Sequence, residues 1–222
     1  MSPRPPRLPP PGAHRAAAAR AQEVLLFWFG QRPYEPAQVS QRARLWFGDP
    51  RAPELTPQTD ELIAERFSSL MMYAARGELS SWESSPRRRL ALILLLDQFP
   101  RNVHRGTPGA FAQDAQALSL AVSGMQFGAD AALDPLERLF FYMPLMHAES
   151  LEVQDESVAA FRRLQEEAPE ELRAQFDSAL RYARLHREVI ARFGRFPHRN
   201  HILGRRDTSA EAQWLASEDP GV

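Results

Sequence analysis

The sequence predicts an all-α fold, and three observations support that expectation. Apolar residues recur at the helical period in nearly every segment, the alternating pattern of strands is almost absent, and pairs of a capping residue and a proline stand where helices should begin. The chain has 222 residues, which suits one large domain. We expect a single helical domain over residues 14–222, preceded at 1–13 by a disordered tail rich in proline.

Seven or eight helices are expected. The first contains Phe27 and Trp28 and ends at Gly30, and a polar connection that bears prolines follows it. Thr56-Pro57 has the pattern of an N-cap followed by proline at the first helical position. We therefore expect the second helix to start there and to end at Gly77.

The third helix is expected at the centre of the molecule. It opens at Ser85-Pro86 and includes the run from Leu90 to Leu96, which is apolar on all sides and therefore belongs in the interior. We expect it to end before Pro100, because a proline disfavours the helical conformation of the residue before it, here Phe99.

Similar signals continue through the second half of the chain. The fourth helix is expected to present Phe111, Leu118 and Met125 on its apolar face. The remaining predicted boundaries are starts at Thr107-Pro108 and Asp134-Pro135, an end of the long seventh helix at Gly194, and a capping box of Thr208 with Glu211.

The composition excludes several classes of function. Cys is absent, which removes disulfides, thiol nucleophiles and Cys-ligated metal sites, and all 27 basic residues are arginine, which removes lysine chemistry. The pI of about 6.6 argues against nucleic acid as a partner. The longest apolar run, seven residues, is too short to cross a membrane, so we expect a cytoplasmic protein without membrane contact.

Four ionisable residues interrupt or end apolar helical stripes: Asp97, Asp114, His147 and His186. Such residues must be paired, hydrogen-bonded or shifted in pKa. A single one is usually a satisfied core group, whereas four on separate helices can converge on one interior cavity. We take Asp97, His147 and His186 as candidate catalytic residues, with a histidine as the proton carrier. Whether the four residues meet stays open at this point.

Two similar loops follow the third and seventh helices, Phe99-Pro100-Arg101-Asn102 and Phe196-Pro197-His198-Arg199-Asn200. Planar arginine forks suit bidentate capture of phosphate or carboxylate, and residues 181–206 hold eight arginines against one acid. We expect a small anionic molecule to bind between the loops, as the substrate of a hydrolase or transferase if the protein is an enzyme. The expected ligand-binding residues are Arg101, Asn102, His104, Arg105, Arg195, His198, Arg199 and Asn200.

Two other interpretations remain open. His198-x-x-His201 and His147-x-Glu149 have spacings that a metal-dependent enzyme uses, with Mg²⁺, Mn²⁺ or Zn²⁺ as the ion, so the sequence leaves the cofactor unknown. A helical scaffold that binds a protein partner in a groove belongs to a different class of function.

Several long segments carry a family resemblance. They are Leu95 to Asn102, His104 to Thr107, Phe140 to Glu149 and Arg192 to Asn200, with Phe27-Trp28-Phe29-Gly30, Trp46-Phe47 and Leu203-Gly204-Arg205. Over about residues 20–216 the chain resembles the bacterial family known as domain of unknown function 924. The resemblance implies an all-helical bundle of antiparallel hairpins similar to tetratricopeptide-repeat proteins. It implies no activity, substrate or catalytic residue.

Overall fold

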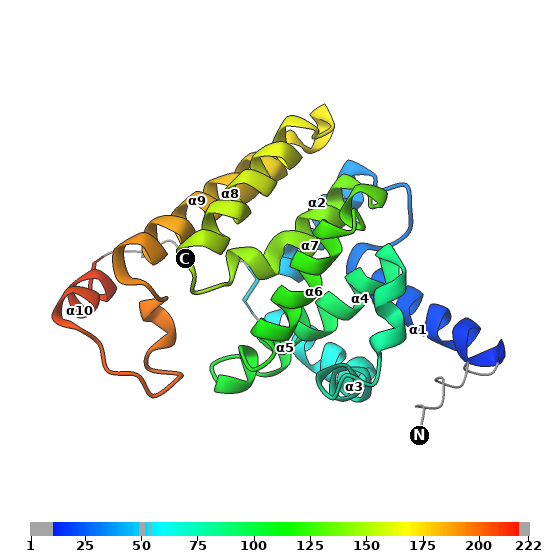
Figure 1. Cartoon of the computed structure of the whole chain (residues 1–222), viewed down its shortest axis with the longest axis horizontal. Coiled ribbons are helices and arrows are strands. Elements are labelled where there is room, and N and C mark those ends of the chain that lie inside the picture. Colours follow the sequence, from blue (N-terminus) through cyan, green and yellow to red (C-terminus); the bar gives the residue numbers. More distant parts are fainter. Residues whose placement is uncertain (1–10, 49–51, 54, 218–222) are drawn as a thin grey trace, which may run out of the picture.

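The computed structural model describes residues 11–48, 52–53 and 55–217, which form helices and turns without a strand (Figure 1). The predicted all-α class is confirmed. The α-helices of this part are α1 (Pro11–Phe29), α2 (Pro36–Phe47), α3 (Leu55–Ala75), α4 (Pro86–Leu96), α5 (Gln98–Val103), α6 (Asp114–Gln126), α7 (Pro135–Met146), α8 (Leu151–Glu166), α9 (Arg173–Phe193) and α10 (Ser209–Leu215). Shorter 3-10 helices are η1 (Ser80–Ser84), η2 (Pro108–Ala110), η3 (Asp130–Ala132), η4 (Glu170–Leu172) and η5 (Pro197–Arg199).

Helix α4 forms the centre of the body, as its apolar run predicts. Every residue from Arg89 to Leu96 is buried, and α4 contacts α1, α3, α6 and α7. Aromatic side chains extend this core on one side, and edge-to-face rings add to the free energy gained by burial. The cluster consists of Phe27, Trp28, Phe29, Trp46, Phe67, Phe99 and Phe140.

Helices α8 and α9 pack along their length as an antiparallel hairpin beside the body (Figure 1). The chain leaves α9 at Gly194, whose φ of 70° is the left-handed conformation that favours glycine after a helix. A segment without long helices follows, and α10 begins with the predicted capping box of Thr208 and Glu211. A small apolar cluster separate from the main core holds this end together: Val189, Ile190 and Phe196, packed against Phe193 and Trp214.

Two boundaries in the first part of the chain differ from expectation. Helix α1 begins at Pro11, so residues 11–13 are helical and not part of a tail, and residues 1–10 lie outside the described ones. The connection after Gly30 contains α2. The polar sequence of α2 gives no apolar helical stripe, because Val39 is the one residue that α2 buries fully.

The predicted helix boundaries around α3 to α5 also differ from the observed ones. Thr56 lies inside α3 and is not its N-cap. Helix α4 ends at Leu96, Asp97 separates it from α5, and Phe99 is helical within α5. Pro100 is tolerated there because it sits in the first turn of α5, where a backbone N–H has no helical partner in any case.

The remaining differences concern α6 and the end of α7. Thr107-Pro108 opens η2, so Phe111 precedes α6. Helix α6 fully buries Ala117, Leu120, Ala121 and Gly124, whereas the expected Leu118 and Met125 pack against the core only partly buried. His147 is the residue directly after α7 and not part of a helical stripe. The described residues contain ten α-helical segments, more than the seven or eight expected, because α2 and the short α5 were not anticipated.

Candidate functional site

A buried carboxylate and a histidine form the centre of the site. Asp97 is fully buried at the break between α4 and α5. Its Oδ1 lies 2.6 Å from Nδ1 of His147, which follows α7. The side-chain amide of Gln98 donates to Oδ2 of Asp97, and the guanidinium of Arg101 lies 3.4 Å from Oδ1. The backbone break that ends α4 therefore carries the carboxylate that orients the histidine.

The protonation states of this pair follow from its surroundings. Burial alone raises the pKa of Asp97, but Arg101 and the bond with His147 outweigh it and hold that pKa well below its usual range. Burial, followed by the positive charge of Arg101, lowers the pKa of His147 below the usual 6.5, although Asp97 acts in the opposite sense. At neutral pH an ionised Asp97 therefore accepts the Nδ1–H of a neutral His147, which leaves the lone pair on Nε2.

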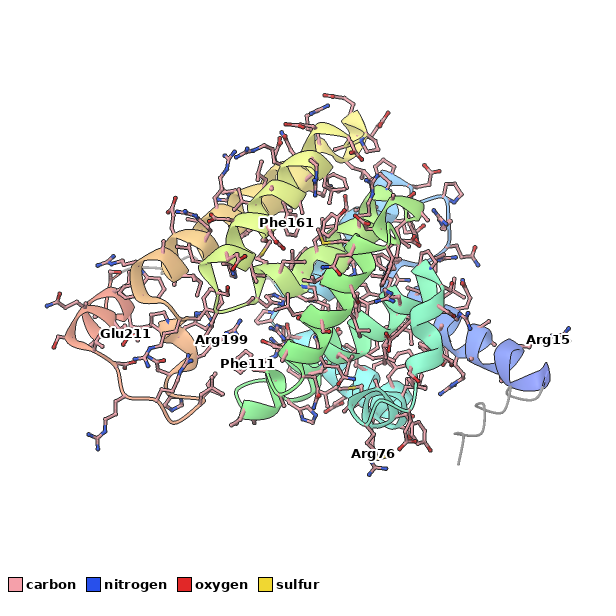
Figure 2. The ribbon with its side chains drawn as sticks, viewed as in Figure 1. Arg15, Arg76, Phe111, Phe161, Arg199 and Glu211 are labelled. Atoms are coloured by element: carbon pink, nitrogen blue, oxygen red, sulfur yellow. The ribbon has the colours of Figure 1, made fainter. Side chains whose placement is uncertain are left out.

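The two similar loops meet at one carboxylate, Asp114 at the start of α6. Arg101 donates to both of its oxygens at 2.8 and 2.9 Å, and Arg199 donates to one of them at 3.2 Å. The ring of Phe111 lies against both guanidiniums, at 5.6 Å from Arg101 and 4.7 Å from Arg199. Figure 2 shows Phe111 and Arg199 next to each other, where the C-terminal segment meets the body. The ring of Phe196 lies 4.4 Å from the same guanidinium of Arg199.

Two more histidines lie beside this cluster. The ring of His186 is 5.4 Å from that of Phe196, and its Nδ1 lies 2.9 Å from the carbonyl oxygen of Tyr182. Burial, followed by the charge of His147, lowers the pKa of His186 to about 3. Burial, followed by the charge of Arg199, lowers the pKa of His198 to about 4. Both imidazoles are therefore neutral at pH 7.

The four polar residues singled out in the sequence thus share one neighbourhood. Asp97 and Asp114 share Arg101, and Asp97 bonds His147. His186 lies beside Phe196, whose ring lies against the guanidinium of Arg199 that bonds Asp114. Helical phase alone could not show this, because it does not fix which helix faces which.

Glu149 ties the turn after α7 to the C-terminal segment. It accepts the backbone N–H of Phe196 at 2.8 Å and two hydrogen bonds from Arg205 at 2.7 and 2.9 Å. Burial alone raises the pKa of Glu149, but these hydrogen bonds outweigh it and lower that pKa. Arg205 was not among the expected site residues, and its position just after the paired loop motif is the signal that points to it.

The second loop region also holds buried polar atoms that lack a partner within the described residues. They are Nδ1 of His198, Nε of Arg199, Oδ1 of Asn200 and Nε of Arg205. Buried polar atoms are satisfied in most native proteins, so four such atoms within eight residues mark this segment as one whose polar groups are not all satisfied by the described part of the chain.

Several expected ligand-binding residues serve other partners. The side chains of Asn102 and Arg105 donate to Asp60 of α3 at distances from 2.8 to 3.1 Å and thereby fasten α5 to α3. The side chain of His104 is exposed and lies next to Gly109.

On the second loop, Arg195 and Asn200 likewise have acidic partners. Arg195 forms a two-pronged ion pair with Glu211 at 2.6 and 2.8 Å, and Asn200 donates to Asp207 at 2.7 Å. Of the eight expected ligand-binding residues, Arg101 contacts Asp97 directly, Arg199 binds the Asp114 that Arg101 also binds, and the ring of His198 lies 5.6 Å from that of Phe196.

The described residues do not present a ready metal site. No group of three or more His, Asp or Glu side chains among them is arranged to hold a metal ion, and His201 is exposed. The spacing His198-x-x-His201 therefore does not bring together a ligand set in the part of the chain that the structure describes.

The fold and site define a class: an all-α protein with a buried carboxylate–imidazole pair beside an arginine cluster. The chain belongs to the family described as bacterial protein of unknown function, DUF924, whose model matches residues 24–219. It is similar to a solved structure, the protein of unknown function ATU0120 from Agrobacterium tumefaciens, with 34% sequence identity and a TM-score of 0.73. That match covers 90% of this chain and 98% of the other. No curated protein matches the chain significantly.

None of the described helices combines the length and the hydropathy that a membrane-crossing helix requires.

Proposed function

We propose that this protein binds a small molecule bearing a phosphate or carboxylate beside His147, and that His147 transfers a proton in a hydrolysis or group-transfer reaction. The hydrogen bond of 2.6 Å between Asp97 and Nδ1 of His147 carries this proposal. It leaves Nε2 as a base, and Nε2 has no hydrogen-bond partner within the described residues. The paired aspartate orients the ring and stabilises the imidazolium once a proton arrives.

Arg199 is the residue best suited to hold the anionic group. One terminal nitrogen donates to Asp114, and the rings of Phe111 and Phe196 lie against the guanidinium. Its Nε is buried without a partner in the described part of the chain, so it retains a donor for a phosphate or carboxylate oxygen. Burial, followed by the charge of Arg101, lowers the pKa of Arg199 to about 10, which still keeps it charged at neutral pH.

The charge balance makes binding depend on pH. The three arginines 101, 199 and 205 are matched by the carboxylates of Asp97, Asp114 and Glu149, and the nearby histidines are neutral at pH 7. An added anion favours the protonated form of a neighbouring imidazole. We therefore expect anion binding to take up a proton and to strengthen as the pH falls from about 8 to about 6.

A thermal-shift screen tests this proposal. The probes are inorganic phosphate, nucleotides, small carboxylates and divalent metal ions, each with and without chelator, at about pH 6 and about pH 8. A site-specific binder at ~100 times its dissociation constant adds about 2.7 kcal/mol of stability, which is a shift of a few degrees for a domain of this size. We expect a shift with an anion that is larger at the lower pH.

Two variants make the screen specific. Arg199→Ala should remove the anion-dependent shift, whereas Arg187→Ala should retain it, because Arg187 forms an exposed ion pair with Asp155 on α8. Absence of a shift with every anion, or an equal shift in Arg199→Ala, contradicts the proposal. A shift seen with a metal ion alone would favour a metal-dependent enzyme instead.

A protein-partner scaffold similar to tetratricopeptide-repeat proteins is the second candidate. A groove of about 320 Å³ between α3, α5 and η2 favours it, because apolar residues such as Met71, Met72 and Val103 line much of the groove. A search for a partner protein with the wild-type chain and with Met72→Glu separates this candidate from the first. Met72→Glu should lose a partner that binds in the groove. Met72 is exposed, and the groove that it lines does not include His147, His186 or His198.

A further inference from the structure

A buried glutamine bonds the turn that carries His147. Gln154, on α8, has no exposed surface, and its Nε2 donates to the carbonyl oxygens of Met146 at 2.7 Å and Ala148 at 2.9 Å. A third, longer contact of 3.4 Å joins the same nitrogen to the carbonyl oxygen of Leu145. The two shorter bonds are to the residues on either side of His147.

The end of α7 explains why such a side chain is needed. The last four carbonyl groups of a helix lack helical partners, and a glycine in the left-handed conformation often supplies the cap. Here His147 occupies the cap position with φ −84° and ψ −7°, which is a right-handed conformation, so α7 has no left-handed glycine at this cap position. Gln154 supplies the missing donor. Its Oε1 is buried without a partner within the described residues, which indicates that the amide N–H groups are the useful part of the side chain.

We infer that Gln154 is a positioning residue that fixes the backbone around His147 so that Nδ1 of this histidine meets Asp97. It acts through the main chain of residues 145–148 and is not itself a catalytic residue. A hydrogen bond of 2.6 Å does not survive a displacement of about 1 Å, so small movements of this turn suffice to break it. The inference rests on the proposed function only for the role of His147 in proton transfer.

The test is nitrogen NMR of the histidine side chains across a pH titration of the full chain. His147→Gln assigns the His147 signals. Gln154→Met keeps a side chain of similar length but removes the donor. In this variant we expect the Nδ1–H signal of His147 to lose its protection from exchange. We also expect the pKa of His147 to fall further below 6.5, because the bond with Asp97, which raises it, is lost while the burial that lowers it remains.

Two controls on the same helix separate positioning from general loss of stability. Leu164→Ala removes a buried side chain at the far end of α8 and should lower the melting temperature without moving the pKa of His147. Gln165→Ala removes an exposed glutamine–aspartate bond and should change neither quantity. An unchanged His147 signal in folded Gln154→Met, or an equal pKa shift in Leu164→Ala, overturns the inference.

If Gln154→Met does not fold, a measurement on the wild-type protein still tests the inference. The side-chain amide protons of Gln154 should exchange slowly with solvent, and fast exchange overturns the inference. None of these measurements needs a bound anion. Failure of the anion screen would therefore remove the proposed function and leave the effect of Gln154 on His147 to be judged separately.

Discussion

The segments 99–102 and 196–200 share a Phe-Pro start and an Arg-Asn end, yet they are embedded in different surroundings. Phe99 packs in the main core, with ring centroids 5.0 Å from Phe67 and 5.4 Å from Trp28. Phe196 belongs to the small separate cluster, and its ring neighbours include His186 and His198.

The same local pattern thus stands on the main core in one place and among unsatisfied polar groups in the other. The first segment sits on a large apolar core, and its Asn102 is satisfied by Asp60. The second has a small core and several buried polar atoms without partners in the described residues. Polar atoms of this kind cost stability and call for an explanation, of which a catalytic or binding role is one. We therefore propose the second segment as the one of the pair that faces a ligand.

The largest expected effect is the loss of stability on replacing each of the two phenylalanines, which should differ between them. Phe99→Ala should lower the free energy of unfolding by about 3 to 5 kcal/mol, because it opens a cavity in the main core. Phe196→Ala should cost roughly half as much, because its cluster is small and borders polar groups that water can reach. Denaturant unfolding of both variants measures this, and equal costs would show that the two surroundings are energetically alike.

A smaller effect is expected where the two segments meet. Asp114→Ala leaves the guanidiniums of Arg101 and Arg199 without their shared carboxylate. We expect the free energy of unfolding to fall by about 2 kcal/mol, which is less than for a fully buried ion pair because Asp114 is partly exposed. Asp155→Ala, which removes the partner of exposed Arg187, should cost less than about 0.5 kcal/mol and serves as the control. Equal losses in denaturant unfolding would mean that the network at Asp114 is no stronger than a surface ion pair.

The smallest effect is the pH dependence that the second segment should confer. His186 and His198 have pKa values of about 3 and about 4, below the usual 6.5, so the unfolded chain binds more protons than the folded one in this range. Stability is therefore fully present above about pH 7 and falls as the pH drops toward 4. At pH 5 these pKa values correspond to about 2 kcal/mol per histidine, which solvent screening of the partly exposed rings reduces to on the order of 1 kcal/mol. His186→Gln should flatten the decrease between pH 7 and 5 in thermal unfolding. An unchanged slope would show that His186 is not buried in its neutral form.

The sequence predicted the helices whose signals are local and strong. The capping box at Asp134 confirms the predicted start of α7, and Gly194 ends α9 as predicted. Helix α2 escaped prediction because it buries little, and Pro100 was misread because its effect depends on where a helix begins. Asp97 was recognised by its polar side chain at the end of an apolar run, whereas the importance of Gln154 has no signal in its local sequence.

The sequence by itself determined the all-α class, the central place of α4 and the identity of the polar residues that had to be compensated. Those properties depend on periodicity, capping and burial cost, which act between residues close along the chain. Only the tertiary structure decided that Asp97 meets His147, that Arg101 and Arg199 share Asp114, and that Arg195 is held by Glu211. The sequence places a side chain on a helix face or in a loop, but the packing of separate elements decides which groups come within hydrogen-bonding distance.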